Sequence, residues 1–221
     1  MRLTLGAIPS LLLLSACYVP IENSSAMSID FALGQVDEAC AQSGTSSSDQ
    51  GSTTFEHSLI GADCVTSLAW DGSFIDFGSV KSAVSQALSD RGVDPAGLDV
   101  ALDDVDIRVT AFSFQDALGN VIETSGDAPC AIGLDIGGSP DVLRVEGNAV
   151  GAPAVTLAAD HALLVAEAQA AYDAGAALRG HAEGSVTVRA ADVQQFSESQ
   201  EGVVAHLDFV VTVDATATYH D

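Results

Sequence analysis

The chain has 221 residues, of which 48% are hydrophobic and 17% charged, so it is long enough to bury a substantial core. Its 31 acidic residues outnumber its 7 basic residues, which gives a net charge of −24, and Lys81 is its only lysine. This charge argues against nucleic acid as a partner, because affinity for nucleic acid comes from basic side chains that neutralise phosphates. It also disfavours anionic membrane surfaces.

The first residues have the layout of a secretory signal peptide. Arg2 is the single positive charge in front of an apolar run from Leu3 to Leu14, and the small residues Ser15 and Ala16 follow. The apolar run is too short to cross a bilayer as a helix, which takes about 20 residues. We therefore expect residues 1–16 to be removed as a leader.

The sequence Leu14-Ser15-Ala16-Cys17 resembles a lipobox, the site at which the signal peptides of bacterial lipoproteins are cut. The resemblance covers the leader only. It implies that the Cys17 thiol receives a diacylglycerol group, that the new amino terminus is acylated, and that these acyl chains hold the protein on a membrane. In the enterobacterial version of this family an Asp after the Cys retains the protein at the inner membrane. Tyr18 at that position is therefore compatible with transfer to the outer membrane, facing either side.

Export also implies an oxidising compartment, in which disulfides persist. If Cys17 carries lipid, Cys40, Cys64 and Cys130 remain, and three pairings are open to them. The pair Cys40–Cys64 closes the shortest loop and is the preferred disulfide. We expect the leftover thiol to be buried and structural.

The segments that follow the leader differ in polarity. Residues 17–27 are expected to be a polar tether, and a single globular domain is expected over 28–221. Residues 42–54 read QSGTSSSDQGSTT, which cannot bury a core and predicts a flexible loop. The pair Asp71-Gly72, which lies between two short apolar runs, predicts a tight hairpin turn.

Two helices and one long strand are predicted further along. Apolar residues spaced four apart predict a helix over 80–90, with Ser79 as its N-cap. The alanine-rich segment from Asp160 to Ala174 predicts a second helix that Asp160 and Gly175 cap. Regular alternation of apolar and polar residues over 203–219 predicts a half-buried antiparallel strand.

Eight or more short strands broken by Gly and Asp predict a mainly β fold, an antiparallel β-sandwich with two short helices inserted. In this general pattern the domain resembles β-rich bacterial envelope lipoproteins of uncharacterised role. No motif beyond the lipobox carries that likeness.

One cluster of acidic residues suggests a metal site. Asp94, Asp99, Asp103 and Asp104 crowd a short stretch that leads into a predicted strand. Calcium takes six to eight oxygen ligands, and loops at strand ends can supply them. The stretch lacks the D-x-D-x-D-G pattern, and a solvated acidic edge that prevents sheet-to-sheet aggregation explains it equally well.

The sequence carries no recognisable catalytic motif. Its five histidines have neither the H-x-x-x-H nor the H-E-x-x-H spacing, and there is no nucleophile elbow, phosphate loop or dinucleotide fingerprint. We therefore expect a non-enzymatic lipoprotein of the outer membrane that serves binding, assembly or structure in the cell envelope, with an envelope protein as a candidate partner. The alternatives are a membrane-tethered envelope hydrolase and a calcium-dependent surface binding module, and calcium is the one cofactor considered.

The charge predicts how stability depends on salt. Loss of the leader with Arg2 leaves 6 basic residues against 31 acidic ones, a net charge of −25. Because the folded chain concentrates carboxylates that repel one another, its melting temperature should rise with sodium chloride from about 0.01 M to about 0.15 M. A melting temperature indifferent to salt would contradict this account.

Calcium separates screening from binding. If calcium only screens charge, magnesium at equal concentration should have the same effect. A calcium site should instead stabilise the protein saturably, and Asp99→Asn should weaken that effect.

Overall fold

The structure, a computed structural model, describes residues 18–90, 92, 94, 96, 98–124, 127–148, 154–157, 161–198 and 202–219. Within them the fold is mainly β. The strands are β1 (Tyr18–Gly34), β2 (Ser43–Ser47), β3 (Gly51–Ile60), β4 (Asp63–Asp76), β5 (Leu98–Asp116), β6 (Pro129–Ile136), β7 (Ser139–Asn148), β8 (Ala154–Leu157), β9 (Ala177–Val188) and β10 (Val203–Tyr219). The helices are α1 (Phe77–Ser89), α2 (His161–Ala174) and α3 (Val193–Ser197). In this part of the chain no helix has the length and apolarity needed to span a membrane.

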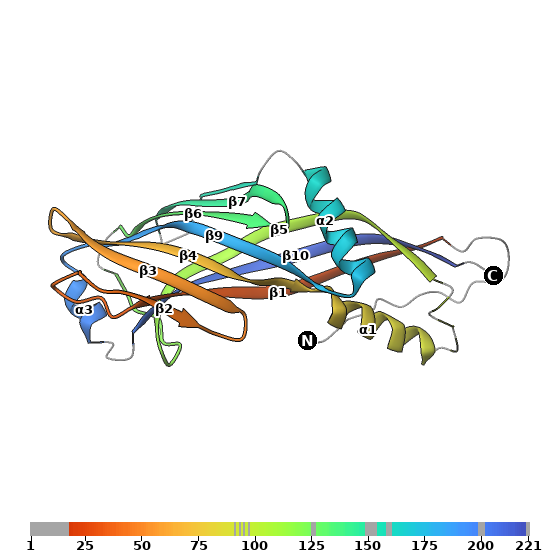
Figure 1. Cartoon of the computed structure of the whole chain (residues 1–221), viewed down its shortest axis with the longest axis horizontal. Helices are drawn as coiled ribbons and strands as arrows, with labels where there is room; N and C mark the ends of the chain where they lie inside the picture. The colour runs from red at the N-terminus through yellow and green to blue at the C-terminus, as the bar shows by residue number, and fades with distance from the viewer. Residues whose placement is uncertain are drawn as a thin grey trace.

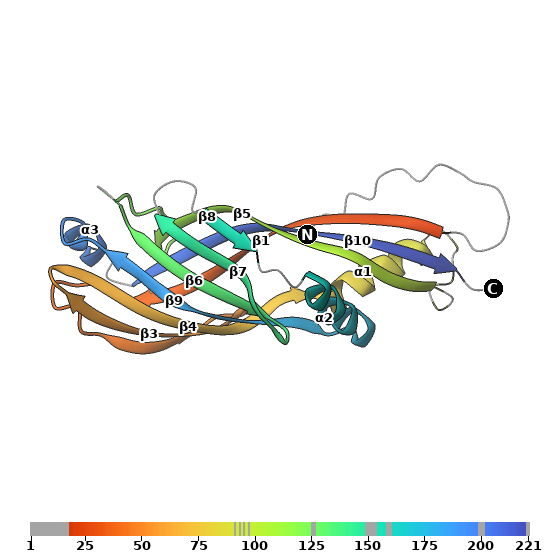
Figure 2. The same cartoon turned by 90° about the horizontal axis from the view of Figure 1, so that it is seen from above.

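The strands form two antiparallel sheets, which confirms the predicted β-sandwich-like fold (Figure 1). The smaller sheet has the order β1-β10-β5, and the larger has the order β2-β3-β4-β9-β6-β7-β8. The long strands of the smaller sheet extend beyond the larger sheet at the end where β1 begins and β10 finishes (Figure 2). The molecule is therefore elongated, with α3 at the opposite end from the start of β1 (Figures 1 and 2).

Strand β10 is the centre of the smaller sheet, and its prediction over 203–219 is confirmed. It pairs with β1 on one side and with β5 on the other along its whole length. Its apolar residues Leu207, Phe209 and Val211 are buried, because they face the larger sheet, while the polar residues between them are more exposed. The stacked rings of Phe209 and Phe74 in β4, with centroids 5.0 Å apart, join the two sheets.

The larger sheet meets β1 through Trp70, whose ring packs edge-on against Phe31 with centroids 6.2 Å apart. Space for the indole comes from glycines, because Gly51, Gly72 and Gly180 lie directly opposite one another in β3, β4 and β9. A Cβ on Gly72 would lie 2.2 Å from Cζ2 of Trp70, and one on Gly180 would lie 3.0 Å from Cζ3.

The predicted turn at Asp71-Gly72 is therefore wrong, because β4 runs straight through it from Asp63 to Asp76. The glycine removes a side chain from beneath the indole instead of reversing the chain.

Two segments predicted to be irregular are strands. Residues 18–27 of the expected tether belong to β1, because each of them finds a backbone partner on the long β10. The expected flexible loop at 42–54 is a hairpin, in which Ser43↔Glu56 and Ser47↔Ser52 bound the pairing of β2 with β3. Its polar sequence suits an edge strand, since β4 supplies the ladder on which the hairpin is built.

The helices match their predicted positions more closely than their predicted caps. Helix α1 is capped by Asp76 and not by Ser79, since the Asp76 carboxylate accepts hydrogen bonds from the backbone N–H groups of Gly78 and Ser79. Gly175, with φ of +60°, ends α2 as predicted, whereas Asp160 lies outside the described residues. The third helix, α3, was not predicted; it holds Phe196 against Phe114 of β5.

The glycine row generates a stability test. Gly72→Ala should destabilise the protein by about 1–3 kcal/mol, as overpacking of a filled core does, because the new methyl group overlaps the indole and the Gln50 carbonyl. Ser73→Ala, one residue along on the opposite face, is the matched control and should change stability by less than about 0.5 kcal/mol. Chemical denaturation measures the free energy of unfolding of both variants. A Gly72→Ala variant as stable as the wild type would show that Trp70 does not need the space that Gly72 leaves.

Candidate functional site

The predicted lipidation residue, Cys17, lies outside the described residues, and β1 begins at the next residue, Tyr18. The structure contains the predicted Cys40–Cys64 disulfide, with the two Cα atoms 5.5 Å apart. Cys130 is a buried free thiol, and burial raises its pKa to about 11, which keeps it protonated and unreactive.

The four aspartates proposed for calcium are not brought together. Asp94 precedes β5 and accepts a hydrogen bond from the backbone N–H of Ala96, whereas the other three lie along β5. An extended strand spaces Asp99 and Asp104 by about 16 Å. Asp103 accepts a hydrogen bond from the Thr216 hydroxyl at 2.6 Å. The clustering in sequence therefore does not become a shared ligand sphere in the fold.

Strand pairing creates a different acidic row, which the sequence did not reveal. Asp104, Asp214 and Glu22 stand directly opposite one another across β5, β10 and β1. Like charges at directly opposite positions destabilise a sheet. The row is therefore a concrete origin for the salt-dependent stability expected from composition. Knowledge of the register was needed to find it.

Each sheet carries one histidine held between two carboxylates. His206 in β10 has Nδ1 2.5 Å from Asp30 and Nε2 3.1 Å from Asp208. His181 in β9 has Nδ1 2.7 Å from Asp71 and Nε2 3.3 Å from Glu183. The hydrogen bond to Asp71 is the main cause that raises the pKa of His181 above its usual value of 6.5.

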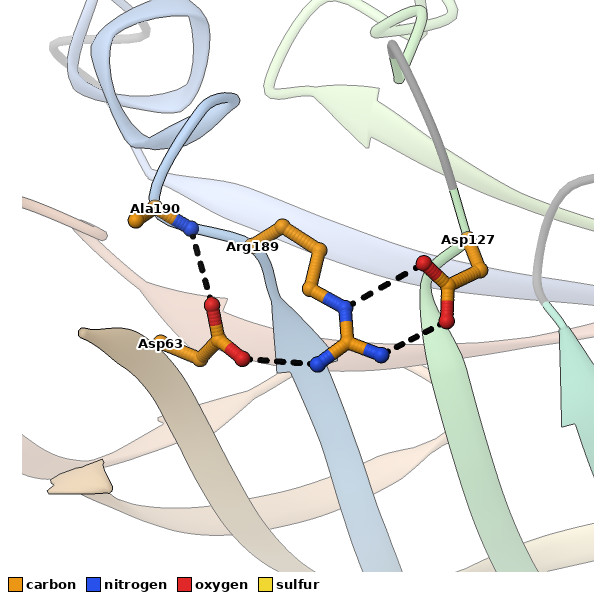
Figure 3. A network of polar contacts seen from close by, with 4 residues as sticks. All are labelled: Asp63, Asp127, Arg189 and Ala190. Carbon is orange, nitrogen blue, oxygen red and sulfur yellow. Dashed lines mark hydrogen bonds and ion pairs between the residues drawn. The ribbon is translucent and has the colours of Figure 1, made fainter. Parts of the chain in front are cut away.

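An arginine joins three separate segments at one end of the larger sheet (Figure 3). Arg189, just after β9, places Nη1 2.6 Å from Asp63 at the start of β4 and Nη2 2.6 Å from Asp127 before β6. The second Asp63 oxygen accepts the backbone N–H of Ala190 at 3.1 Å. Hydrogen bonds from Arg189 lower the pKa values of both aspartates. The guanidinium and the two carboxylates use their hydrogen bonds on one another, so this cluster holds the three segments together.

Open depressions mark the surface of the described part of the chain. One runs along α1 to Gly175 at the end of α2, where the chain's only lysine, Lys81, donates to the carbonyl of Asp173 at 2.8 Å. This contact stabilises the C-terminal end of α2. Another covers the outward faces of β2, β3 and β4 near Glu183. In the first depression the Ser79 hydroxyl donates to the Asp76 carboxylate at 2.5 Å, and the same carboxylate caps α1 by accepting the backbone N–H groups of Gly78 and Ser79.

The fold also brings together a buried group of potential metal ligands that the sequence pattern did not predict. One ligand atom from each of Cys40, His57 and Cys64 lies within 4.8 Å of the other two, and within the described ranges no other group of three meets this criterion. The alternation of inward residues in β3 was the available signal, since Thr53, Phe55 and His57 share one face.

Comparisons with protein-family models, with curated proteins and with solved structures found no match to this chain.

The pKa of His181 predicts a pH effect on stability. Because the folded state raises this pKa, the histidine contributes stability that is fully present below its unfolded pKa of about 6.5 and is lost as pH rises through the folded value. The unfolding free energy of the wild type should therefore exceed that of His181→Gln by more at about pH 5.5 than at about pH 8.5. Denaturant titrations at both pH values measure this difference, and a gap that widens with rising pH would show the assignment to be wrong.

Proposed function

We propose that this chain is a lipoprotein of the bacterial outer membrane, held by acyl chains on Cys17, and that its β-sandwich serves binding, assembly or structure in the envelope. The observation that carries the proposal is Leu14-Ser15-Ala16-Cys17, an apolar leader that ends in small residues and a cysteine. Two or more acyl chains suffice for stable anchoring, so the acidic body needs no membrane-binding surface of its own.

The contacts of the surface histidines support a binding role over an enzymatic one. A general base needs a ring nitrogen that can reach a substrate proton. In His181 and His206 both ring nitrogens lie within hydrogen-bonding distance of carboxylates of their own sheet. Because their ring nitrogens contact carboxylates of the protein itself, these imidazoles do not offer a free nitrogen to a substrate.

The position of β1 supports an orientation in which the long axis of the molecule points away from the membrane. Because β1 begins at Tyr18, no flexible tether separates Cys17 from the smaller sheet. The long axis would therefore lead away from the bilayer (Figures 1 and 2). Three large apolar side chains are exposed in two turns. At the end of β3, Leu59 exposes 55% of its surface and Ile60 exposes 63%; after β5, Leu118 exposes 81%. These turns lie at the end remote from Tyr18, where an envelope partner would be reached (Figures 1 and 2).

Anchoring is tested by replacing the lipidated residue. Cys17→Ser should abolish metabolic labelling by a fatty acid and should move the protein out of the outer-membrane fraction. Cys130→Ser is the matched control, because it removes another thiol from the same chain and should leave labelling and fractionation unchanged. Membrane attachment and labelling that survive in Cys17→Ser would disprove the proposal.

A further inference from the structure

The Cys40–Cys64 disulfide lies beside a buried histidine. Cys40, His57 and Cys64 expose 3%, 5% and 0% of their surface, and their ligand atoms lie within 4.8 Å of one another. They come from three segments: the connection between β1 and β2, strand β3, and the start of β4. Two sulfurs and an imidazole, the ligand types that zinc prefers, therefore converge at one buried point.

The histidine is held in the orientation of a metal ligand. Its Nε2 lies 2.6 Å from the carbonyl oxygen of Leu33, and because a carbonyl only accepts, Nε2 carries the proton. In the neutral ring the lone pair is then on Nδ1. A histidine that binds a metal commonly donates its other N–H to a carbonyl or carboxylate, which fixes the tautomer and the ring.

That lone pair has nothing to bind among the described residues. Nδ1 of His57 is buried without a hydrogen-bond partner, and so is the hydroxyl of Thr66. Thr66 is the residue directly opposite His57 in the pairing of β3 with β4, and it is fully buried. Buried polar atoms without partners cost free energy and are rare in folded proteins. Two such atoms lie on residues that face each other across β3 and β4, and one of these residues, His57, lies beside the two sulfurs, where a ligand would give its Nδ1 a partner.

We propose that Cys40, His57 and Cys64 form a zinc site when the disulfide is reduced. Reduction by a dithiol breaks the S–S bond, delivers two electrons and two protons to give two thiols, and oxidises the dithiol to its own disulfide. Zn²⁺ then displaces both thiol protons and is bound by two thiolates and by Nδ1 of His57. Thr66, which lies directly opposite His57 and whose buried hydroxyl has no hydrogen-bond partner, is the candidate for a neutral fourth ligand.

The required movement is small. Tetrahedral zinc with Zn–S bonds of about 2.3 Å places two sulfurs about 3.8 Å apart, which rotation of the two cysteine side chains can provide. Thiolate and imidazole are the ligands that zinc prefers, whereas the carboxylates that dominate this protein's surface suit calcium and magnesium. The chain would thus have two alternative crosslinks at one position: a disulfide when oxidised and a zinc ion when reduced.

Cobalt is the spectroscopic probe for this site. The full chain with Cys130→Ala, and with Cys17→Ser so that Cys40 and Cys64 are its only cysteines, is reduced with a phosphine and titrated with Co²⁺ without oxygen. We expect thiolate-to-cobalt charge-transfer bands and tetrahedral d–d bands that saturate at one ion per chain and disappear when Zn²⁺ is added. The oxidised chain should give neither set of bands. A reduced, folded chain without these bands would overturn the proposal.

His57→Gln tests the third ligand, because it keeps a polar side chain but removes the imidazole. The variant should bind Co²⁺ at least about tenfold more weakly and with a changed d–d spectrum. If it does not fold, the reduced chain with Cys17→Ser and Cys130→Ala decides alone: Zn²⁺ should raise its melting temperature saturably, and should leave that of the oxidised chain unchanged. No zinc-dependent rise in the reduced chain, or unchanged cobalt binding by a folded His57→Gln, would refute the site.

Discussion

The packing of Trp70 between the two sheets is the contact on which the rest of the structure depends. Its indole is 1% exposed, meets Phe31 of the smaller sheet edge-on and lies over the row of glycines in β3, β4 and β9. Because the glycines remove three side chains from one place, the largest side chain in the protein fits without separating the sheets. Phe74 and Phe209 extend the same contact along β4 and β10. These contacts fix which faces of the sheets turn inward.

Once the inner faces are fixed, the described acidic residues lie outside the core, with Asp192 as the exception, and the pairing of the strands decides which of them meet. The row of Glu22, Asp214 and Asp104 concentrates negative charge on the smaller sheet. Elsewhere the few cations are used within the fold: Arg189 joins two aspartates, and Lys81 binds carbonyls at the end of α2. A surface with so little positive charge favours cationic ligands over polyanions.

Much of the fold could be predicted from periodicity, because strand and helix patterns are local. The alternation in 203–219 gave β10, and the alanine-rich segment that ends at Gly175 gave α2. Prediction failed where a neighbour decides the structure. Residues 18–27 and 42–54 have weak patterns of their own and become strands because β10 and β4 offer paired edges.

The candidate sites follow the same rule. The preference for Cys40–Cys64 rested on loop length, which the sequence contains. The acidic row, the carboxylate pairs around His181 and His206, and the approach of His57 to the cysteines depend on strand register, which cannot be read from the sequence. Three of the four aspartates proposed for calcium lie along β5, and an extended strand spaces residues that are near in sequence well apart.

The central claim is that the two sheets form one cooperative unit around Trp70, and the chain's only tryptophan can test it directly. Unfolding in urea is followed at once by tryptophan fluorescence, which reports the contact between the sheets, and by far-ultraviolet circular dichroism, which reports the strands. The account predicts coincident transitions with the same midpoint, as expected of a two-state domain. A fluorescence transition that is complete at a urea concentration at which the strand signal is still intact would contradict it.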